Sequence, residues 1–473
     1  MTDIASTSLV WFRRDLRLSD HPALFAAAAK GPVIPVFILD PETEQLGAAP
    51  RWRLEQSLKS LAADLDALGM KLTLRKGPAL SVLRELIAET GAGAVHWSRL
   101  YDPTSKARDT EAKAALKGDG VHAESHYGHL LWEPWVGQTK TGGFFKVYTP
   151  YWKSMHSRDV PECLPVPKLT APVAWPNSLS LSELNLSHDM LRGGDLLARH
   201  GIIGASAAQD RLDWFLSNAI GAYDTARDAT DQDATSGLSE NFTTGEISVR
   251  QAWHAGKRAW EEGAAGAEVF CKELVWREFA WHLMHHTPHI ATENWRPEWN
   301  GFPWQGETEA AERWKRGMTG VPMVDAGMRQ MYVTGKMHNR VRMLVASYLT
   351  KHLLVDWRVG MTWFDDCLTD WDPASNAMGW QWTAGSGPDA SPYFRIFNPE
   401  SQAEKFDKLG NYRHRWLAET YSEPHVDALS YFDAVPRAWG LSPDQPYPKQ
   451  IIDLKAGRER ALEAYQTHRK AAA

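Results

Sequence analysis

A hydroxyl-rich loop in the sequence ATSGLSENFTTGEIS could bind phosphate groups. It contains Thr235, Ser236, Leu238 and Ser239, and a helical segment follows it. Hydroxyls and backbone N–H groups at the start of a helix suit a pyrophosphate. The same residues also fit an ordinary helix N-cap, so the residues alone leave both interpretations open.

Two further sets of polar residues could bind a polar ligand or a metal ion. Arg342 and Asp370 could form a buried ion pair that faces a polar ligand, or a plain salt bridge that anchors a helix. Histidines at the i, i+3, i+4, i+7 spacing could present metal ligands on one helix face, and these are His282, His285, His286 and His289. No H-E-x-x-H motif is completed and Pro288 ends the helix within the set, so we expect no metal site.

Composition narrows the class of protein. The chain has 473 residues, which favours two domains, with 43% hydrophobic and 23% charged residues, as in soluble globular proteins. Its net charge of -6 argues against a nucleic-acid-binding surface over the whole protein, but a local basic patch remains possible. Most of the 23 tryptophans are expected to serve packing, but so large a number also favours ring stacking or electron transfer by some of them.

The cysteine pattern and the hydropathy of the sequence argue against further classes of protein. Cys163, Cys271 and Cys367 are isolated, which argues against a disulfide framework, a zinc ribbon or an iron–sulfur cluster. No apolar run reaches the length of a membrane span, and the start of the chain has no signal-like segment. We therefore expect a cytoplasmic protein without a membrane partner.

The first 132 residues alternate short β-rich runs with helical stretches. The expected strands are 9–13, 33–40, 71–75 and 94–98, and the expected helices are 22–29, 53–68, 78–90 and 105–116. This alternation predicts an α/β domain with a doubly wound parallel sheet. The first strand-to-helix turn has no G-x-G-x-x-G motif, so a Rossmann dinucleotide site is not expected there.

The remainder of the chain divides into a connection and a helical domain. Residues 133–203 form an interdomain linker, which includes a Pro-rich extended stretch over 151–185. Residues 204–473 predict an all-α domain, with a loop-rich segment over 371–406. Its expected helices are 207–217, 249–262, 267–285, 307–317, 322–334, 341–355 and 361–368.

Several long strings in the second half resemble the photolyase/cryptochrome family. They are KELVWREFAWHL, VPMVDAGMRQMYVTGKMHNRVRMLVASYL, LLVDWRVG, TDWDPASNAMGWQW and SPYFRIFNP. The resemblance runs in order from LVWFRRDLRLSD near the start to NPESQAEKF near the end, and so it covers most of the chain. The DPTSKARD and DWDPASNA strings are similar to bacterial members called class III, and class I remains the alternative.

The resemblance implies an FAD site in the helical domain. The hydroxyl-rich loop then binds the FAD phosphates, Arg342 and Asp370 contact the flavin, Asp372 bonds the ring edge, and Asn376 lies opposite the flavin N5. Asn376 is the residue usual in photolyases, and a neutral amide can stabilise an anionic reduced flavin without supplying an acidic proton. Gly237 replaces an Arg common in relatives. The other implied FAD contacts are Tyr223, Phe270, Glu273 and Arg277.

The resemblance also implies a substrate pocket, a DNA-binding surface and an electron relay. Trp276 and Trp382 would sandwich flipped-out bases, Glu273 and Asn339 would hydrogen-bond them, and Met343 would supply an apolar wall typical of dimer repair. The implied DNA contacts are Arg227, Arg277, Arg340, Arg395, Gln402 and Lys405. The implied relay to photoexcited oxidised flavin runs from exposed Trp304 through Trp357 to Trp380; each alone could be ordinary packing.

These implications predict a monomeric enzyme that repairs cyclobutane pyrimidine dimers in UV-damaged DNA, using reduced anionic FAD and light, with no obligate protein partner. The alternative is a cryptochrome-type blue-light photoreceptor, and a third is a generic FAD oxidoreductase, which the missing nicotinamide-binding fingerprint disfavours. Relatives hold a folate, a deazaflavin or a flavin as a second, light-harvesting chromophore against the α/β domain, and some hold none, so the resemblance leaves open whether this chain binds one and which. Ser105 stands where folate-binding relatives often carry Glu, which argues against that binding mode.

Overall fold

A five-stranded parallel sheet forms the centre of the N-terminal part of the protein. The computed structural model describes residues 7–190 and 193–471. The strands are β1 (Ser8–Phe12), β2 (Val33–Leu39), β3 (Thr73–Lys76), β4 (Ala94–Ser98) and β5 (His122–His126). They lie in the order β3-β2-β1-β4-β5, and every pairing is parallel. The predicted α/β class is therefore confirmed.

Helices cover both faces of this sheet. Val10 and Phe12 face one side, where they pack with α1 (Pro22–Ala28) and α3 (Ala48–Asp66). Leu9 and Trp11 face the other side, where they pack with α4 (Ala79–Thr90), and α5 (Pro103–Gly118) adds its Leu116. A short α2 (Pro41–Glu44) lies between β2 and α3. The alternation of side chains along each strand thus produces two apolar layers.

The strand β5 was missed by the sequence analysis. Its residues, HAESH, are polar, and Ala123 alone is buried among them. An edge strand needs no apolar face on its outer side, so it gives little hydrophobic signal. Parallel pairing with β4, from Ala94 opposite His122 to Ser98 opposite His126, holds it in the sheet.

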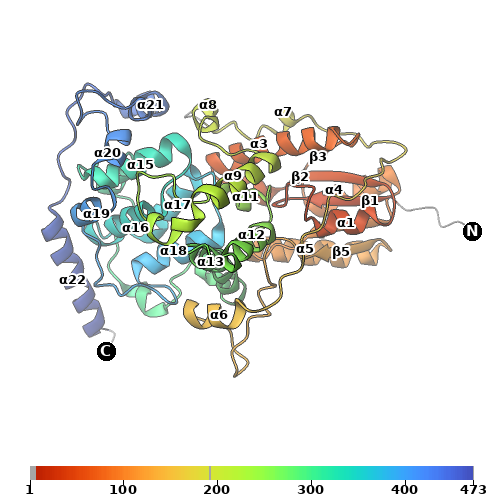
Figure 1. Ribbon diagram of the computed structural model, residues 1–473, viewed down its shortest axis with the longest axis horizontal. Coiled ribbons are helices and arrows are strands. Elements are labelled where there is room, and N and C mark those ends of the chain that lie inside the picture. The colour runs from red at the N-terminus through yellow and green to blue at the C-terminus, as the bar shows by residue number, and fades with distance from the viewer. Residues whose placement is uncertain (1–6, 191–192, 472–473) are drawn as a thin grey trace, which may run out of the picture.

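The extended connection and the helical half follow, and Figure 1 shows the sheet at one end of the molecule and α22 at the other. The connection carries α6 (Tyr148–Met155), α7 (Leu181–Leu184) and α8 (Gly194–Ala198). The helices after it are α9 (Ala205–Asn218), α10 (Tyr223–Ala226), α11 (Ser239–Thr244), α12 (Val249–Glu261), α13 (Ala267–His286), α14 (Glu309–Lys315), α15 (Pro322–Thr334), α16 (Asn339–Ser347), α17 (Trp357–Cys367), α18 (Pro373–Ala384), α19 (Pro399–Phe406), α20 (Asn411–Trp416), α21 (Val426–Ala434) and α22 (Leu454–Ala471). No helix of the described residues is long and apolar enough to cross a membrane.

Two expectations about this half were wrong. The segment 371–406 is not mainly loop, because it contains α18 and α19. Asp372 caps α18, and Pro373 occupies its first turn, a pair that reads as a loop although both favour a helix start. The single helix expected over 341–355 is instead α16 followed by a π-helical turn, Tyr348–His352.

Buried ion pairs join the sheet region to the helical region. Asp20, from the turn after β1, accepts hydrogen bonds from both Arg250 (2.6 Å) and Ser248 (2.5 Å) of the α12 start. Arg53 of α3 pairs with Glu246, and both side chains are almost fully buried. Charges removed from water in this way require their partners, so the two regions are held in a defined arrangement. The domain limits 1–132, 133–203 and 204–473 stay a prediction.

Candidate flavin and substrate site

Three neighbouring helices carry most of the residues expected to bind flavin and substrate. Helix α18 packs against both α13 and α16. Asn376, Trp380 and Trp382 lie on α18, Glu273, Trp276 and Arg277 on α13, and Asn339, Arg342 and Met343 on α16. Asp370 and Asp372 lie just before α18. The fold therefore brings together residues that are separated by about a hundred positions in the sequence.

The ion pair between Arg342 and Asp370 forms as expected. An Arg342 guanidinium nitrogen lies 2.8 Å from Asp370 Oδ2, and Arg342 Nε donates to the Met337 carbonyl at 2.8 Å. The other carboxylate oxygen, Oδ1, is buried without a hydrogen-bond partner among the described residues. A buried, unpaired acceptor is costly, so this oxygen is suited to accept a hydrogen bond from a bound polar ligand. The interpretation as a plain salt bridge leaves that oxygen unexplained.

Asp372 has a double role at the start of α18. It caps the helix by accepting the Ser375 N–H at 2.8 Å, and it pairs with Arg14 at 3.0 Å. Burial alone would raise the pKa of Asp372, but the nearby Arg14 and Arg277 and the Ser375 hydrogen bonds hold it below its usual value. The carboxylate is therefore ionised and can accept a hydrogen bond from an N–H group of a ligand.

Arg14 was not identified by the sequence analysis. It follows β1, and besides Asp372 it donates to the Thr243 carbonyl at 3.0 Å. The signal was present in LVWFRRDLRLSD, which has paired arginines directly after a buried strand. Arg14 thus connects the sheet region to the residues expected around the flavin.

Asn376 is buried on α18 with its amide orientation fixed. Its side-chain nitrogen donates to the Asp372 carbonyl at 3.1 Å, and its exposed fraction is 8%. The amide stays neutral and cannot deliver an acidic proton, whatever the pH.

The hydroxyl-rich loop lies directly before α11. None of its hydroxyls caps that helix, because the N-cap residue is Leu238 and no side-chain cap bond forms among the described residues. Gly237 has φ +67°, a conformation that favours glycine. Arg211 donates to the Ser236 and Thr235 carbonyls at 2.8 and 2.7 Å, so a guanidinium lies beside this glycine. A cation is present here although an Arg at position 237 is not, and Arg211 was missed by the sequence analysis.

The expected aromatic contacts to FAD are packed together nearby. Tyr223 and Phe270 are both buried, and their rings meet edge to face at 5.9 Å. Burial, with Glu273 next in effect, raises the pKa of Tyr223 beyond its normal range, so its hydroxyl remains a neutral donor.

Trp276 is half-buried and stacked on a residue that the sequence analysis missed. The Tyr148 ring lies 3.6 Å from it with an interplanar angle of 7°. Tyr148 begins α6 in the string KVYTPYWK, and its hydroxyl donates to the Lys272 carbonyl at 2.7 Å. One face of the Trp276 indole is therefore covered by Tyr148, which fixes the orientation of the ring.

Glu273, Asn339, Met343 and Trp382 remain accessible around it. Asn339 is exposed, and the other three are half-buried. Glu273 forms an ion pair with Arg227. A carboxylate and an amide next to aromatic faces match the chemistry of nucleobase recognition.

The expected DNA-contacting residues differ in how exposed they are and in whether they already form an ion pair. Arg395 and Lys405 are exposed, and Gln402 is half-buried on α19. Arg227 and Arg340 are half-buried and paired with Glu273 and Asp228, respectively. To bind DNA, each of these arginines would have to share its guanidinium group between its carboxylate partner and a phosphate.

Arg277 occupies a different place from the other expected DNA contacts. Its guanidinium donates to the His129 carbonyl at 3.0 Å and to Glu278 at 3.1 Å, and 12% of its side chain is exposed. It also lowers the pKa of Asp372. Its position suits support of the flavin site and not a phosphate contact.

The three tryptophans of the expected relay differ in burial. Trp380 and Trp357 are buried, and Trp304 is half-buried instead of exposed as expected. Gly360 of α17 leaves no room for a side chain against the Trp380 ring, so α17, which begins at Trp357, packs directly on it. Trp304 stacks on Trp299 at 5.6 Å, which covers part of its surface.

In the histidine set at the end of α13, His282 is bonded through both of its ring nitrogens. His282 Nδ1 bonds the Pro134 carbonyl at 2.8 Å, and its Nε2 accepts the Phe145 N–H at 3.1 Å. Burial lowers the pKa of His282 to about 4, so it is a neutral residue with both nitrogens occupied.

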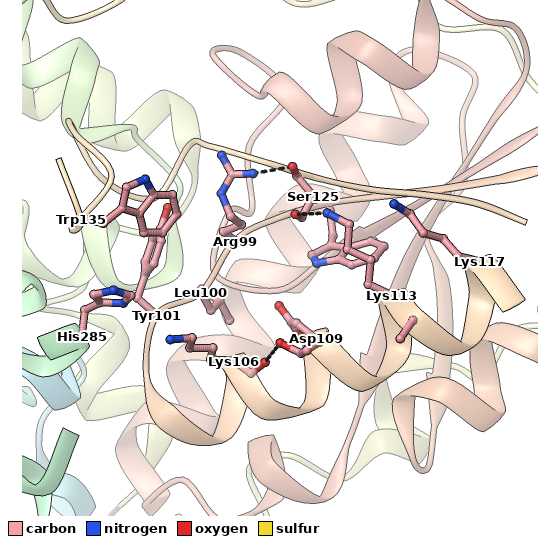
Figure 2. A pocket seen from close by; sticks show the side chains of 13 residues that line it. Arg99, Leu100, Tyr101, Lys106, Asp109, Lys113, Lys117, Ser125, Trp135 and His285 are labelled. Carbon is pink, nitrogen blue, oxygen red and sulfur yellow. Dashed lines mark hydrogen bonds between the residues drawn. The ribbon is translucent and has the colours of Figure 1, made fainter. Parts of the chain in front are cut away.

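A cavity of about 380 Å³ lies between α5 and the end of α13. Figure 2 shows Trp135, Tyr101 and His285 at one end and the Lys113 and Lys117 ammonium groups at the other. Lys113 donates to the Ser125 hydroxyl at 3.0 Å, and burial lowers its pKa. Aromatic rings with several cations suit a flat anionic ligand. Ser105, on α5, lies outside this lining and uses its N–H to bond Asp102.

Comparison with known proteins agrees with this arrangement. Residues 8–170 match the model of the DNA photolyase family, and residues 270–467 match that of the FAD binding domain of DNA photolyase. A deoxyribodipyrimidine photo-lyase from Agrobacterium fabrum is 45% identical over 98% of each chain. Cryptochrome-2 from Arabidopsis thaliana is 35% identical over 98% of this chain and 79% of its own.

A solved structure is similar over the full length. The crystal structure of a bacterial class III photolyase from Agrobacterium tumefaciens superposes with a TM-score of 0.90, at 44% identity, and the match covers 99% of each chain. The order of the motifs, the sheet, the helical half and these matches agree. The chain therefore belongs to the DNA photolyase/cryptochrome family.

Proposed function

We propose that this protein is a deoxyribodipyrimidine photo-lyase of class III, which splits cyclobutane pyrimidine dimers in DNA with light. The observation that carries the proposal is the convergence on α18 of Asn376, for the flavin, and Trp382, for the bases. The 45% identity to a photo-lyase over 98% of each chain supports it.

As a member with the FAD-binding domain of the family, the protein binds FAD. The unpaired Asp370 oxygen fits one end of that cofactor, and the Arg211 guanidinium, which also pairs with Asp233, lies beside the 235–239 loop proposed for its phosphates. The chemistry that bound, reduced FAD supplies under light is donation of one electron to the dimer and its recovery after the two bonds of the cyclobutane ring have broken.

The protein groups act by position and charge. Asp372 and the Arg342–Asp370 pair orient the ring system, and the neutral Asn376 amide stabilises a negative charge next to it without protonating it. No side-chain nucleophile is needed, because the electron that starts the reaction also returns. Trp357 and Trp380 serve the separate reduction of oxidised flavin, with Trp304 toward the surface.

Substrate recognition follows from the aromatic faces and the nearby polar groups. Trp276, fixed by Tyr148, and Trp382 stack on a dimer flipped out of the helix, while Glu273 and Asn339 bond its base edges. Basic and polar side chains around the opening of the substrate pocket bind DNA phosphates. They are Arg395, Lys405, Gln402, Arg227 and Arg340. We infer that the protein acts as a monomer in the cytoplasm on UV-damaged DNA.

The cavity between α5 and α13 is the candidate antenna site. Its aromatic rings and lysines fit a folate or a deazaflavin, each of which is flat and can carry negative charge. Mass spectrometry of the chromophores released from purified protein identifies which one it holds.

A blue-light photoreceptor is the second candidate, because a plant cryptochrome is 35% identical over 98% of this chain. Asn376 and the accessible residues around Trp276 favour repair over signalling.

Illumination of pre-reduced protein with a dimer-containing oligonucleotide distinguishes the two. We expect dimers to disappear in light and to persist in darkness. Persistence of dimers in light, while the flavin cycles between its redox states, would leave the photoreceptor as the function.

A further inference from the structure

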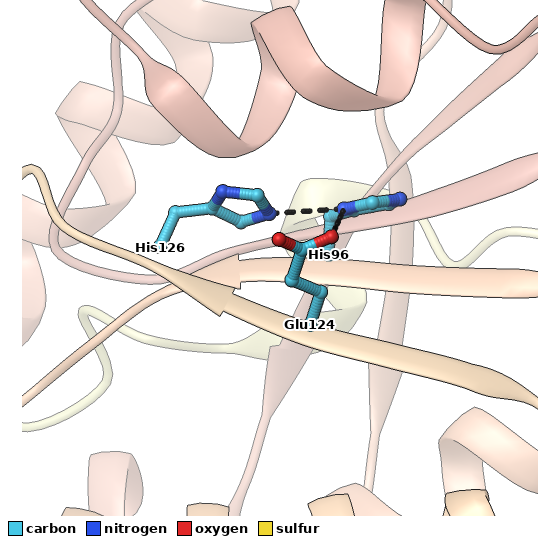
Figure 3. Close-up of side chains that lie close together, drawn as sticks. All are labelled: His96, Glu124 and His126. Atoms are coloured by element: carbon cyan, nitrogen blue, oxygen red, sulfur yellow. Dashed lines mark hydrogen bonds and ion pairs between the residues drawn. The ribbon is translucent and has the colours of Figure 1, made fainter.

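A cluster of metal-ligand side chains lies on the sheet, away from the flavin and substrate residues. His96 is on β4, and Glu124 and His126 are on β5. His96 is directly opposite Glu124 in the register, and Glu124 and His126 share a face because they are two residues apart on one strand. Figure 3 shows the two imidazoles and the carboxylate pointing toward one another.

The candidate ligand atoms are close enough to share one ion. His96 Nδ1 lies 3.0 Å from His126 Nε2 and 4.0 Å from the Glu124 carboxylate, and all three atoms lie within 4.8 Å of one another. Zinc binds histidine nitrogen and carboxylate oxygen at about 2.0–2.2 Å. Small side-chain rotations therefore suffice to place all three around one centre.

The environment of His96 favours a bound ligand. The side chain is completely buried, and its Nε2 has no hydrogen-bond partner among the described residues. Its Nδ1 has only the facing His126 nitrogen, with which it can share a single proton. Two facing imidazole nitrogens that can share only one proton are suited to bind a common ion, which would take the place of that proton.

One charged side chain next to the cluster would oppose a bound cation. The positive charge that would repel a metal ion comes from Lys30, which follows α1 and lies 4.0 Å from Glu124. Lys30 is half exposed and can move aside.

The edge position of β5 supplies access. Glu124 is 45% exposed, so an ion can enter from solvent although His96 is buried. His122, whose Nε2 lies 3.1 Å from the Glu124 carboxylate, is next in the same row and can supply a fourth ligand in place of water.

We propose that His96, Glu124 and His126 form a binding site for a divalent transition-metal ion, with zinc the best match. Two imidazole nitrogens and one carboxylate oxygen are a donor set that zinc uses in proteins. The ion would link the edge strand β5 to β4. The site has no part in the light-driven reaction, so its test does not depend on repair.

Zinc titration of tag-free, FAD-containing protein against a competing chromogenic zinc chelator tests the proposal. We expect one tightly bound zinc per chain. His126→Ala and Glu124→Gln should each weaken binding by at least about 10-fold, the loss that even outer partners of a metal site cause. His188→Ala is the matched control, because it removes an exposed histidine that pairs with Asp189 elsewhere. Absence of a stoichiometric site, or unchanged affinity in both cluster variants, would overturn the proposal.

Zinc X-ray absorption of the native protein keeps the test independent of how the variants fold. We expect a first shell of nitrogen and oxygen with two imidazoles at about 2.0–2.1 Å. A sulfur neighbour at about 2.3 Å would place the ion on a cysteine and refute the assignment.

Discussion

At the residue scale, two of the residues proposed to bind flavin or substrate are held by partners outside their own helices. Tyr148 of α6 stacks on Trp276 of α13, and Arg14 from the sheet region pairs with Asp372 at the start of α18. Both partners fix a residue that is expected to touch a ligand. The precision of the proposed site therefore depends on residues more than a hundred positions away in the sequence.

Trp276→Ala should weaken binding of a dimer-containing oligonucleotide and leave FAD bound. Loss of one stacked base costs about 1–3 kcal/mol, or roughly 5- to 150-fold in affinity. Fluorescence anisotropy with damaged and undamaged oligonucleotides measures it. Trp260→Ala, a half-buried tryptophan of α12 packed on the same core, is the control. Equal affinities for the two variants would remove Trp276 from the substrate pocket.

Trp380→Phe should slow photoreduction of oxidised FAD, because phenylalanine is much harder to oxidise than tryptophan. The ring is buried between α17 and Trp314, so the smaller phenylalanine keeps most of the packing. The flavin absorbance under steady light follows the reduction. An unchanged rate in the variant would show that electrons reach the flavin by another route.

At the element scale, α13 is bound to the segment that follows the sheet through Glu278. Its carboxylate accepts the Leu131 N–H at 2.8 Å, and Arg277 lies 3.1 Å away. Burial raises the pKa of Glu278 to about 7, although Arg277 and the backbone hydrogen bonds act to lower it. This carboxyl group is therefore easier to protonate in the folded protein than in the unfolded chain.

The stability that Glu278 contributes should fall as the pH rises. It is complete below the ordinary carboxyl pKa of 4.5 and is lost as the pH rises through about 7. Glu278→Gln, which resembles the protonated form, should therefore gain stability relative to the native protein between pH 5 and 8, by roughly 3 kcal/mol. Urea unfolding at several pH values measures the difference. Glu261→Gln, at the exposed end of α12, is the control, and a pH-independent difference for Glu278→Gln would contradict this account.

At the scale of the whole molecule, buried charges join the two regions. Asp20 and Arg250 are both almost fully buried, and Arg53 and Glu246 form a second pair. Arg250→Ala removes the ion-pair partner of the buried Asp20 carboxylate, which would keep only neutral hydrogen-bond donors, so it should lower stability by about 3–5 kcal/mol. Thermal unfolding, with the exposed Arg84→Ala as the control, tests this. A loss as small as that of the control would show that the pair does not hold the regions together.

Much of the fold was predictable because its elements carry strong periodic signals. Four buried strands and most of the long helices were identified, but α22 was not, and β5 was missed because HAESH lacks an apolar face. Helix α18 was missed because Asp372 and Pro373 look like a turn in isolation. Among the site residues, the pair Arg342–Asp370 was predictable from the strings that carry it. Arg14, Tyr148 and Arg211 were not, because only the folded chain brings them to their partners.

The central claim is that dimer splitting and flavin reduction use separate residues of one site. The direct measurement is the number of dimers repaired per flash by pre-reduced native protein, Trp276→Ala and Trp380→Phe, at a DNA concentration below saturation. We expect Trp380→Phe to equal the native protein and Trp276→Ala to repair roughly 5- to 150-fold less, in proportion to its lost binding. Full repair by Trp276→Ala together with failure of Trp380→Phe would contradict the account.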